Sequence, residues 1–305
     1  MDEIEKLRAT LELGEKSEYT IRDYIWIAEK MNSFIKRKIS KWTEADVTKF
    51  LFHMKKEWKV KSRTLSKYRT CMISIIKLLG GRIDNTLIPQ IKVKGEAEIF
   101  TFEREEINKM LKKMTPAKTA RISSKRRSWR MKRACILALT YACALRAGEV
   151  ADLLRSDLNL KKRFLRVRAK KSDTVHKIPI IDELVLKLLR RYLEGAKLKP
   201  DEPLFPHDRS NTPYLARAIS GRIFVDLTEP IKVEERTFHS FRHSRATHLI
   251  EDGMKLNQVQ KLLRHKSIKS TEIYDHATAE GLRGIFEEMN IPEKTMKVWN
   301  GVRDD

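Results

Sequence analysis

An unbroken apolar run, ACILALTYACAL at residues 134–145, places the tightest limit on how this 305-residue chain can fold. These twelve residues are too few to cross the hydrocarbon core of a bilayer, which takes about 20 residues of helix. A helix that is apolar on all its faces is instead buried in a globular domain. The run therefore predicts a buried helix in the C-terminal part, and the chain is long enough for two domains with cores of their own.

The part of the chain before this run has helical periodicity. Apolar residues recur at helical spacing over residues 17–79, which predicts a bundle of about four helices closed by Gly80 and Gly81. Residues 1–16 are charged and form an arm or a short helix, and residues 85–98 lack periodicity. We therefore expect an N-terminal helical domain over residues 1–84, a linker over 85–98 and a C-terminal domain over 99–305.

In the C-terminal part, apolar residues recur at helical spacing in some segments and at every second position in others. Residues 101–114 predict an amphipathic helix, and residues 118–133 form a strongly basic segment that we expect to be a loop, either contacting a nucleic-acid backbone or disordered. From residue 157 to 180 the period becomes two, which predicts a small antiparallel sheet with its last turn at residues 169–174. Helices are expected again over 182–192 and 216–227. The expected fold class is mainly α with a small antiparallel β-sheet.

The net charge of +23 indicates a polyanionic partner, because clustered Lys and Arg release counterions from nucleic acid on binding. Residues 1–95 hold 21 basic and 12 acidic side chains, and the rest of the chain holds 43 and 29, so both parts are basic. A solvated, highly charged surface of the kind found in thermophile proteins is the alternative, and the chain has only three Gln. The side chains that we expect to contact DNA phosphates are Lys61, Arg63, Lys67, Arg69, Lys125, Arg126 and Arg127.

The remaining composition points to a cytoplasmic protein without a metal. Cys71, Cys135 and Cys143 have neither Cys-x-x-Cys spacing nor an even count, so we expect reduced core residues. The first residues are charged and acidic, unlike a secretory signal peptide. His239 and His243 lie four residues apart, but the chain lacks His-Glu-x-x-His and an acidic third ligand at a recognisable spacing, which argues against zinc.

The chemistry is concentrated in residues 237–276. Thr237 stands at an N-cap position before an apolar-periodic run, so His239 and Arg242 would share one face of a helix and suit a phosphate. A second helix is expected from about residue 256 to 263, followed by a turn that carries His265. A third short helix from about residue 270 would carry Tyr274, nine residues after His265.

At these residues the chain resembles the tyrosine recombinase family, the phage-type integrases. The family has a His-x-x-Arg helix, a second His or Trp, and a Tyr about nine positions further on, which correspond here to His239, Arg242, His265 and Tyr274. Its Leu-Arg-x-x-Glu signature corresponds to Leu145-Arg146-Ala147-Gly148-Glu149. The family usually has Gly before the second His, and this chain has Arg264 there, which leaves open the geometry of the turn that sets His265.

The resemblance implies an enzyme that breaks and rejoins duplex DNA through a 3′-phosphotyrosine. It makes Tyr274 the nucleophile, Glu149 a supporting residue and the lysine of the 169–174 turn a general acid. Counting back eight residues from Pro179 favours Lys171 over its neighbour Lys170. The resemblance also implies a core-binding fold for the N-terminal domain and no metal or nucleotide cofactor. It further implies a tetramer on DNA that is assembled through the C-terminal helix, here within residues 281–305; the alternative is that this segment packs on its own domain.

Three other functions remain open from the sequence. A type IB topoisomerase uses similar chemistry without exchanging strands between two DNA molecules. A DNA-binding regulator without catalysis would be expected to lack one of the matched residues. A metal-dependent nuclease would need a carboxylate cluster, which the sequence does not contain.

Overall fold

The computed structural model of the chain describes residues 2–93, 100–117, 119–168, 174–208, 211–212, 214 and 216–264. The chain divides into two compact units, residues 1–98 and 99–305. Each unit has its own hydrophobic core. Among the described residues, no helix is both long and apolar enough to cross a membrane.

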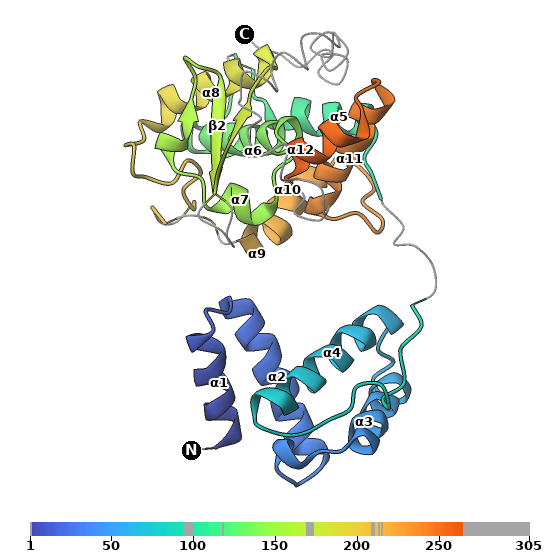
Figure 1. Cartoon of the computed structure of the whole chain (residues 1–305). Coiled ribbons are helices and arrows are strands. Elements are labelled where there is room, and N and C mark those ends of the chain that lie inside the picture. Colours follow the sequence, from blue (N-terminus) through green and yellow to red (C-terminus); the bar gives the residue numbers. More distant parts are fainter. Residues whose placement is uncertain are drawn as a thin grey trace. The chain divides into compact units, whose positions relative to one another are not determined.

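The first unit is a bundle of four helices (Figure 1). The sequence predicts about four helices over residues 17–79; three α-helices lie there, and the fourth lies in the segment 1–16 that was expected to be an arm or a short helix. The helices are α1 (Glu3–Leu13), α2 (Glu18–Phe34), α3 (Glu44–Lys56) and α4 (Ser62–Leu78), with a 3₁₀ turn η1 (Ile39–Lys41) before α3. Two of them begin at side-chain caps. Ser17 Oγ accepts from the Thr20 backbone N–H at 3.3 Å, and the Asp46 carboxylate accepts from the Thr43 backbone N–H at 2.9 Å.

Large apolar side chains fill the core of this unit, among them Trp42, Phe50 and Met54. The chain then leaves α4 through a glycine turn. Gly80 has φ +91°, and a Cβ atom at Gly81 would lie 2.5 Å from the Ser40 carbonyl oxygen. These glycines therefore end the helix and allow the chain to pass close to η1.

The second unit contains a three-stranded sheet, eight α-helices, a 3₁₀ turn and a π-helical segment among its described residues. Its first helices are α5 (Arg104–Met114), α6 (Ser124–Ala142) and α7 (Ala147–Ala151), followed by a 3₁₀ turn η2 (Arg155–Asp157). The strands are β1 (Leu158–Asn159), β2 (Phe164–Arg168) and β3 (Val175–Pro179). The later helices are α8 (Glu183–Ala196), α11 (Phe238–Glu251) and α12 (Leu256–Leu263). Between α8 and α11, the segments α9 (Ala216–Ala218), η3 (Ile219–Ile223, π-helical) and α10 (Phe224–Thr228) follow one another without a break.

Helix α6 is the central element of the second unit (Figure 1). It packs against α5, α8 and α11, and residues 134–139 of the apolar run are fully buried. Cys135 and Cys143 are free thiols in this core, and Cys71 is a free buried thiol in the first unit. The prediction of a buried helix from the apolar run is confirmed.

The prediction of a basic loop before this helix is wrong for most of its length. The basic residues from Lys125 to Arg133 form the first turns of α6, which begins after an N-cap at Ser123. Ser123 Oγ accepts from the Arg126 backbone N–H at 3.2 Å. Lys and Arg are good helix formers, so the charged run continues the helix of the apolar run. Its last two charges, Lys132 and Arg133, are buried.

Acidic partners distant in sequence compensate these two buried charges. Lys132 Nζ lies 2.9 Å from Asp208, and Arg133 lies 2.7 Å from Asp226 and 3.2 Å from Asp208. Burial acts to raise the pKa of Asp208, but hydrogen bonds and the two cations outweigh it and lower that pKa to about 2. These ion pairs fix the basic half of α6 within the domain.

The sheet is antiparallel in the order β1-β2-β3. Leu165 pairs with Ile178, and Leu165 and Val167 are buried on one face of β2. The expected fold class, mainly α with a small antiparallel sheet, is confirmed. The turn that was expected at residues 169–174 lies almost entirely outside the described residues.

Candidate active site

The reversal between α6 and α7 positions Arg146. Ala144 has φ +47°, and Leu145 donates its backbone N–H to the Thr140 carbonyl at 3.0 Å, so the chain turns back and Arg146 becomes the N-cap of α7. Glu149, in the first turn of α7, accepts from the Arg146 backbone N–H at 2.8 Å and from Arg146 Nη1 at 2.8 Å. One carboxylate thus fixes both the backbone and the side chain of Arg146, whose side chain remains 40% exposed.

Arg242 reaches the same turn from α11. This helix begins at Thr237, as predicted, and Ser240 Oγ accepts from the Thr237 backbone N–H at 3.0 Å. Arg242 is 1% exposed, donates to the Ala144 carbonyl at 2.6 Å and also donates to the Leu263 carbonyl. Its guanidinium therefore ties the turn before Arg146 to the last residue of α12.

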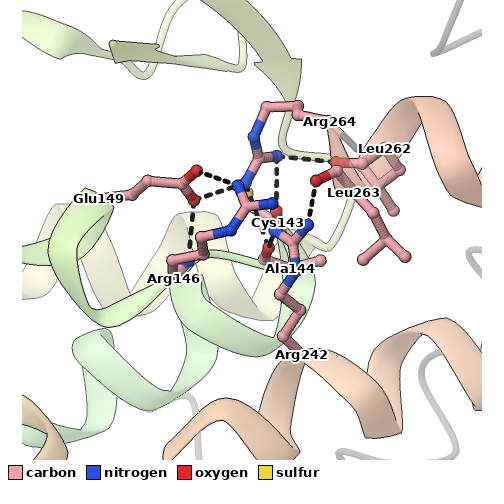
Figure 2. A network of polar contacts seen from close by, with 8 residues as sticks. All are labelled: Cys143, Ala144, Arg146, Glu149, Arg242, Leu262, Leu263 and Arg264. Carbon is pink, nitrogen blue, oxygen red and sulfur yellow. Dashed lines mark hydrogen bonds and ion pairs between the residues drawn. The ribbon is translucent and has the colours of Figure 1, made fainter. Parts of the chain in front are cut away.

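Arg264 completes this cluster (Figure 2). It is the C-cap of α12 in the left-handed conformation, with φ 53° and ψ 44°. This conformation favours glycine, so the structure gives a physical reason for the glycine usual in the family. The Arg264 guanidinium donates to Glu149 at 2.6 Å and to the Leu262 carbonyl at 2.7 Å, with a longer bond of 3.2 Å to the Ala144 carbonyl. Sequence reasoning treated Arg264 only as a departure and did not place it in the site.

The cluster carries excess positive charge. Three guanidinium groups, those of Arg146, Arg242 and Arg264, face the single carboxylate of Glu149. Burial, with repulsion from Arg264 and Arg146, lowers the pKa of Arg242 to about 9. Burial acts to raise the pKa of Glu149, but Arg264 and hydrogen bonds from both arginines outweigh it and lower that pKa. An anion such as a phosphodiester is the ligand that such a cluster favours.

The histidines of α11 divide into two groups. His239 is exposed, and its ring stands edge-on to that of His243, with 4.6 Å between centroids. His248 is 4% exposed and lies 2.7 Å, through Nδ1, from the Tyr141 hydroxyl. No group of three or more His, Cys, Asp or Glu suited to a metal occurs among the described residues.

Four predicted site residues cannot be placed. Lys170, Lys171, His265 and Tyr274 lie outside the described residues, as does the C-terminal segment 281–305. The structure brings Arg146, Glu149 and Arg242 together. It also ends its described part at Arg264, the residue directly before His265.

The side chains of the first unit that were predicted to contact DNA lie on and just before α4. They differ in exposure and in the protein groups that they already contact. Lys61 and Arg63 are exposed. Lys67 is exposed but pairs with Asp23 at 2.7 Å. Arg69 donates to the backbone carbonyls of residues 85, 88 and 89 at 2.6, 2.8 and 3.0 Å. Arg69 therefore holds the start of the expected linker against the first unit.

The candidates of the second unit stand at the start of α6. Lys125 and Arg126 are exposed on its first turn. Arg127 is partly buried and donates to the Ala117 and Ala120 carbonyls at 2.7 Å each, so it fixes the segment before the helix. The structure thus leaves Lys125 and Arg126 as the better placed of the three for contact with a ligand.

Comparison with known proteins assigns the chain to a family. The model of the phage integrase family matches residues 101–280, more than half of the chain, and that of the phage integrase N-terminal SAM-like domain matches residues 4–82. The chain therefore belongs to the phage integrase family, the tyrosine recombinases.

Several curated relatives cover most of the chain. Tyrosine recombinase XerA of Pyrococcus furiosus is 29% identical over 298 residues, which cover 95% of this chain and 94% of the relative. XerD of Listeria innocua is 27% identical over 254 residues, covering 80% and 82%. Among solved structures, the Tn1549 transposon integrase with circular intermediate DNA has a TM-score of 0.63 at 18% identity, covering 93% of this chain and 98% of that one. A lambda integrase tetramer bound to a Holliday junction has a TM-score of 0.65 at 15% identity, covering 89% and 75%. These two likenesses concern the fold.

Proposed function

We propose that this protein is a site-specific DNA recombinase that cuts and rejoins duplex DNA through a covalent bond to Tyr274. The observation that carries the proposal is the convergence of Arg146 and Arg242 on one turn, with Glu149 holding Arg146. Two planar guanidinium groups from different helices can hold the two non-bridging oxygens of one phosphodiester. Family membership and the overall positive charge support DNA as the substrate.

In the proposed reaction the Tyr274 oxygen attacks phosphorus and the bond to the 5′-oxygen breaks. The products are a 3′-phosphotyrosine and a free 5′-hydroxyl, so the phosphoester bond is exchanged and not hydrolysed. A phenol is a weak nucleophile at neutral pH, so charge stabilisation at phosphorus and protonation of the leaving oxygen carry the catalysis. Arg146, Arg242 and His265 would supply the former and Lys171 the latter.

His239 would assist proton transfer, and no metal ion or nucleotide takes part in this scheme. The proposal assigns the region 1–84 to DNA binding beside the catalytic region 99–305. A related integrase is described as a tetramer on a Holliday junction, and we propose the same assembly for this chain. Because the substrate would be cellular DNA, the proposal keeps the cytoplasmic location expected from the sequence.

A nicked suicide substrate tests the proposal. Its short leaving strand diffuses away after cleavage and traps the protein–DNA adduct. Wild-type protein should form this adduct in excess chelator, and Tyr274→Phe should form none while keeping its DNA affinity, because the lost hydroxyl acts in bond making. Tyr19→Phe, at a residue that is 54% exposed in the first unit, is the matched control and should react normally.

An adduct with Tyr274→Phe would overturn the assignment of the nucleophile, and a strict magnesium requirement would favour a nuclease. Strand exchange between two DNA molecules separates a recombinase from a type IB topoisomerase. The convergence of arginines alone serves both reactions.

A further inference from the structure

Arg264 occupies a backbone position that does not suit it. The left-handed conformation at the end of α12 brings the Cβ of an L-residue close to the carbonyl oxygen, which is unfavourable. Glycine would avoid this cost and would close the helix equally well. The position of Arg264 therefore has to be explained by what its side chain does.

The Arg264 side chain is only 5% exposed. Its guanidinium contacts Glu149 at 2.6 Å and backbone carbonyls of two separate segments, Leu262 in α12 and Cys143 and Ala144 in the turn before Arg146. All four of these bonds go to groups of the protein, and one of them goes to the carboxylate that holds Arg146, so the side chain supports its neighbours. Arg146, with 40% of its side chain exposed, is the group that is open to solvent.

Two acceptors are shared between Arg264 and the proposed phosphate-binding arginines. Glu149 Oε2 accepts from Arg264 and from the Arg146 backbone N–H, and the Ala144 carbonyl accepts from Arg264 and from Arg242. Figure 2 shows the three guanidinium groups gathered around these two acceptors. Removing Arg264 would leave Glu149 with Arg146 alone, and the tie between the turn and the end of α12 would then depend on Arg242.

We propose that Arg264 is a positioning residue, which fixes Glu149 and the end of α12 and thereby sets Arg146 and Arg242 for the phosphate. The inference rests on the proposed recombinase function. It places the effect of Arg264 on the covalent step, because its guanidinium bonds to Glu149 and to backbone carbonyls that position Arg146 and Arg242. Misplacement of a reacting group by about 1 Å costs on the order of a hundredfold in rate.

Single-turnover cleavage and DNA affinity, measured separately on the suicide substrate, test this role. Arg264→Gly suits the left-handed backbone and removes only the side chain. We expect cleavage about ten- to a hundredfold slower and a dissociation constant within about twofold of wild type. A rate within about threefold of wild type, or an equal loss in affinity, would overturn the inference.

A double-mutant cycle with Glu149→Gln shows whether Arg264 acts through Glu149. If it does, the double variant should be no slower than the slower single variant, within about threefold, because both changes break the same contact. Fully multiplicative effects would overturn the inference.

Should Arg264→Gly fail to fold, Arg264→Lys decides the question. Lysine keeps the charge and the backbone cost but cannot bond to Glu149 and the carbonyls together, so we expect slower cleavage at unchanged affinity. A wild-type rate for Arg264→Lys would then overturn the inference. If wild-type protein forms no adduct, the proposed function itself fails, which is a separate result.

Discussion

Acid should destabilise the second unit through His248. Its imidazole is buried between α11 and α6, and its Nδ1 lies 2.7 Å from the Tyr141 hydroxyl. Burial raises the pKa of Tyr141 to about 12, so the phenol keeps its proton and can donate it to Nδ1 of the neutral imidazole that is protonated on Nε2. A protonated imidazole would lose this acceptor and would place a second donor against the hydroxyl. This bond is compatible with a neutral His248, and burial of the ring is the main reason why the folded state disfavours the charged form.

The magnitude follows from the pKa of this group. Burial, followed by repulsion from Arg104 and Arg245, lowers the pKa of His248 to about 4, although Asp252 opposes the shift. An unfolded chain would take up the proton near pH 6.5, so stability is complete above that pH and falls as the pH drops toward 4. Between pH 7.5 and 4.5 this linkage amounts to about 2.5 kcal/mol of unfolding free energy.

His248→Asn provides the test, because the amide oxygen can accept from Tyr141 near the position of Nδ1 and cannot take up a proton in this range. Between pH 7.5 and 4.5 the unfolding free energy of the variant should therefore fall by about 2.5 kcal/mol less than that of the wild type. Tyr141→Phe is the matched control: it removes the hydroxyl but leaves the imidazole buried beside the same guanidinium groups, so the fall should remain. Unfolding in urea is measured at both pH values by hydrogen exchange of peptides from α6 and α11. These peptides report on the second unit alone. An unchanged fall in His248→Asn would refute the reasoning.

Charges of α6 lead to two opposite expectations. Arg133→Met should lower the unfolding free energy of the second unit by about 3–5 kcal/mol, because Asp226 and Asp208 lose a buried partner. A loss below about 1 kcal/mol in urea unfolding would contradict the structural role of these ion pairs. Exchanging Lys125 and Arg126 for Gln should instead leave stability unchanged and reduce the log–log salt slope of duplex DNA binding by about two, without altering sequence preference. An equal slope in the variant and the wild type would mean that these two side chains are solvated and do not contact DNA.

Most of the fold was predictable because its signals are local. The helical period of residues 17–79, the apolar run at 134–145 and the alternation at 157–180 each correspond to an observed element. The basic half of α6 was missed because Lys132 and Arg133 look like solvated residues in the sequence. Their carboxylate partners lie about 75 to 93 residues further along the chain, and such pairing leaves no local pattern.

The site was predictable in part for the same reason. Arg146 and Glu149 lie three residues apart, so their contact follows from helix geometry. The approach of Arg242 to Ala144 spans 98 residues and was expected only through resemblance to a family. The burial of Arg242, and the effect on its pKa, depend on side chains that surround it only in the folded domain.

Local preference and tertiary structure disagree most at two points of this site. Ala144 and Arg264 both adopt left-handed backbone conformations without being glycine, at φ +47° and +53°. The Ala144 carbonyl accepts hydrogen bonds from Arg242 and Arg264, so contacts made across the domain offset the local cost at both positions. Reasoning from local propensity favours glycine at each position, because the offsetting contacts come from other helices. Both reversals thus depend on the tertiary bonds of the arginine cluster, and a change in that cluster should alter the turns that carry Arg146 and lead to His265.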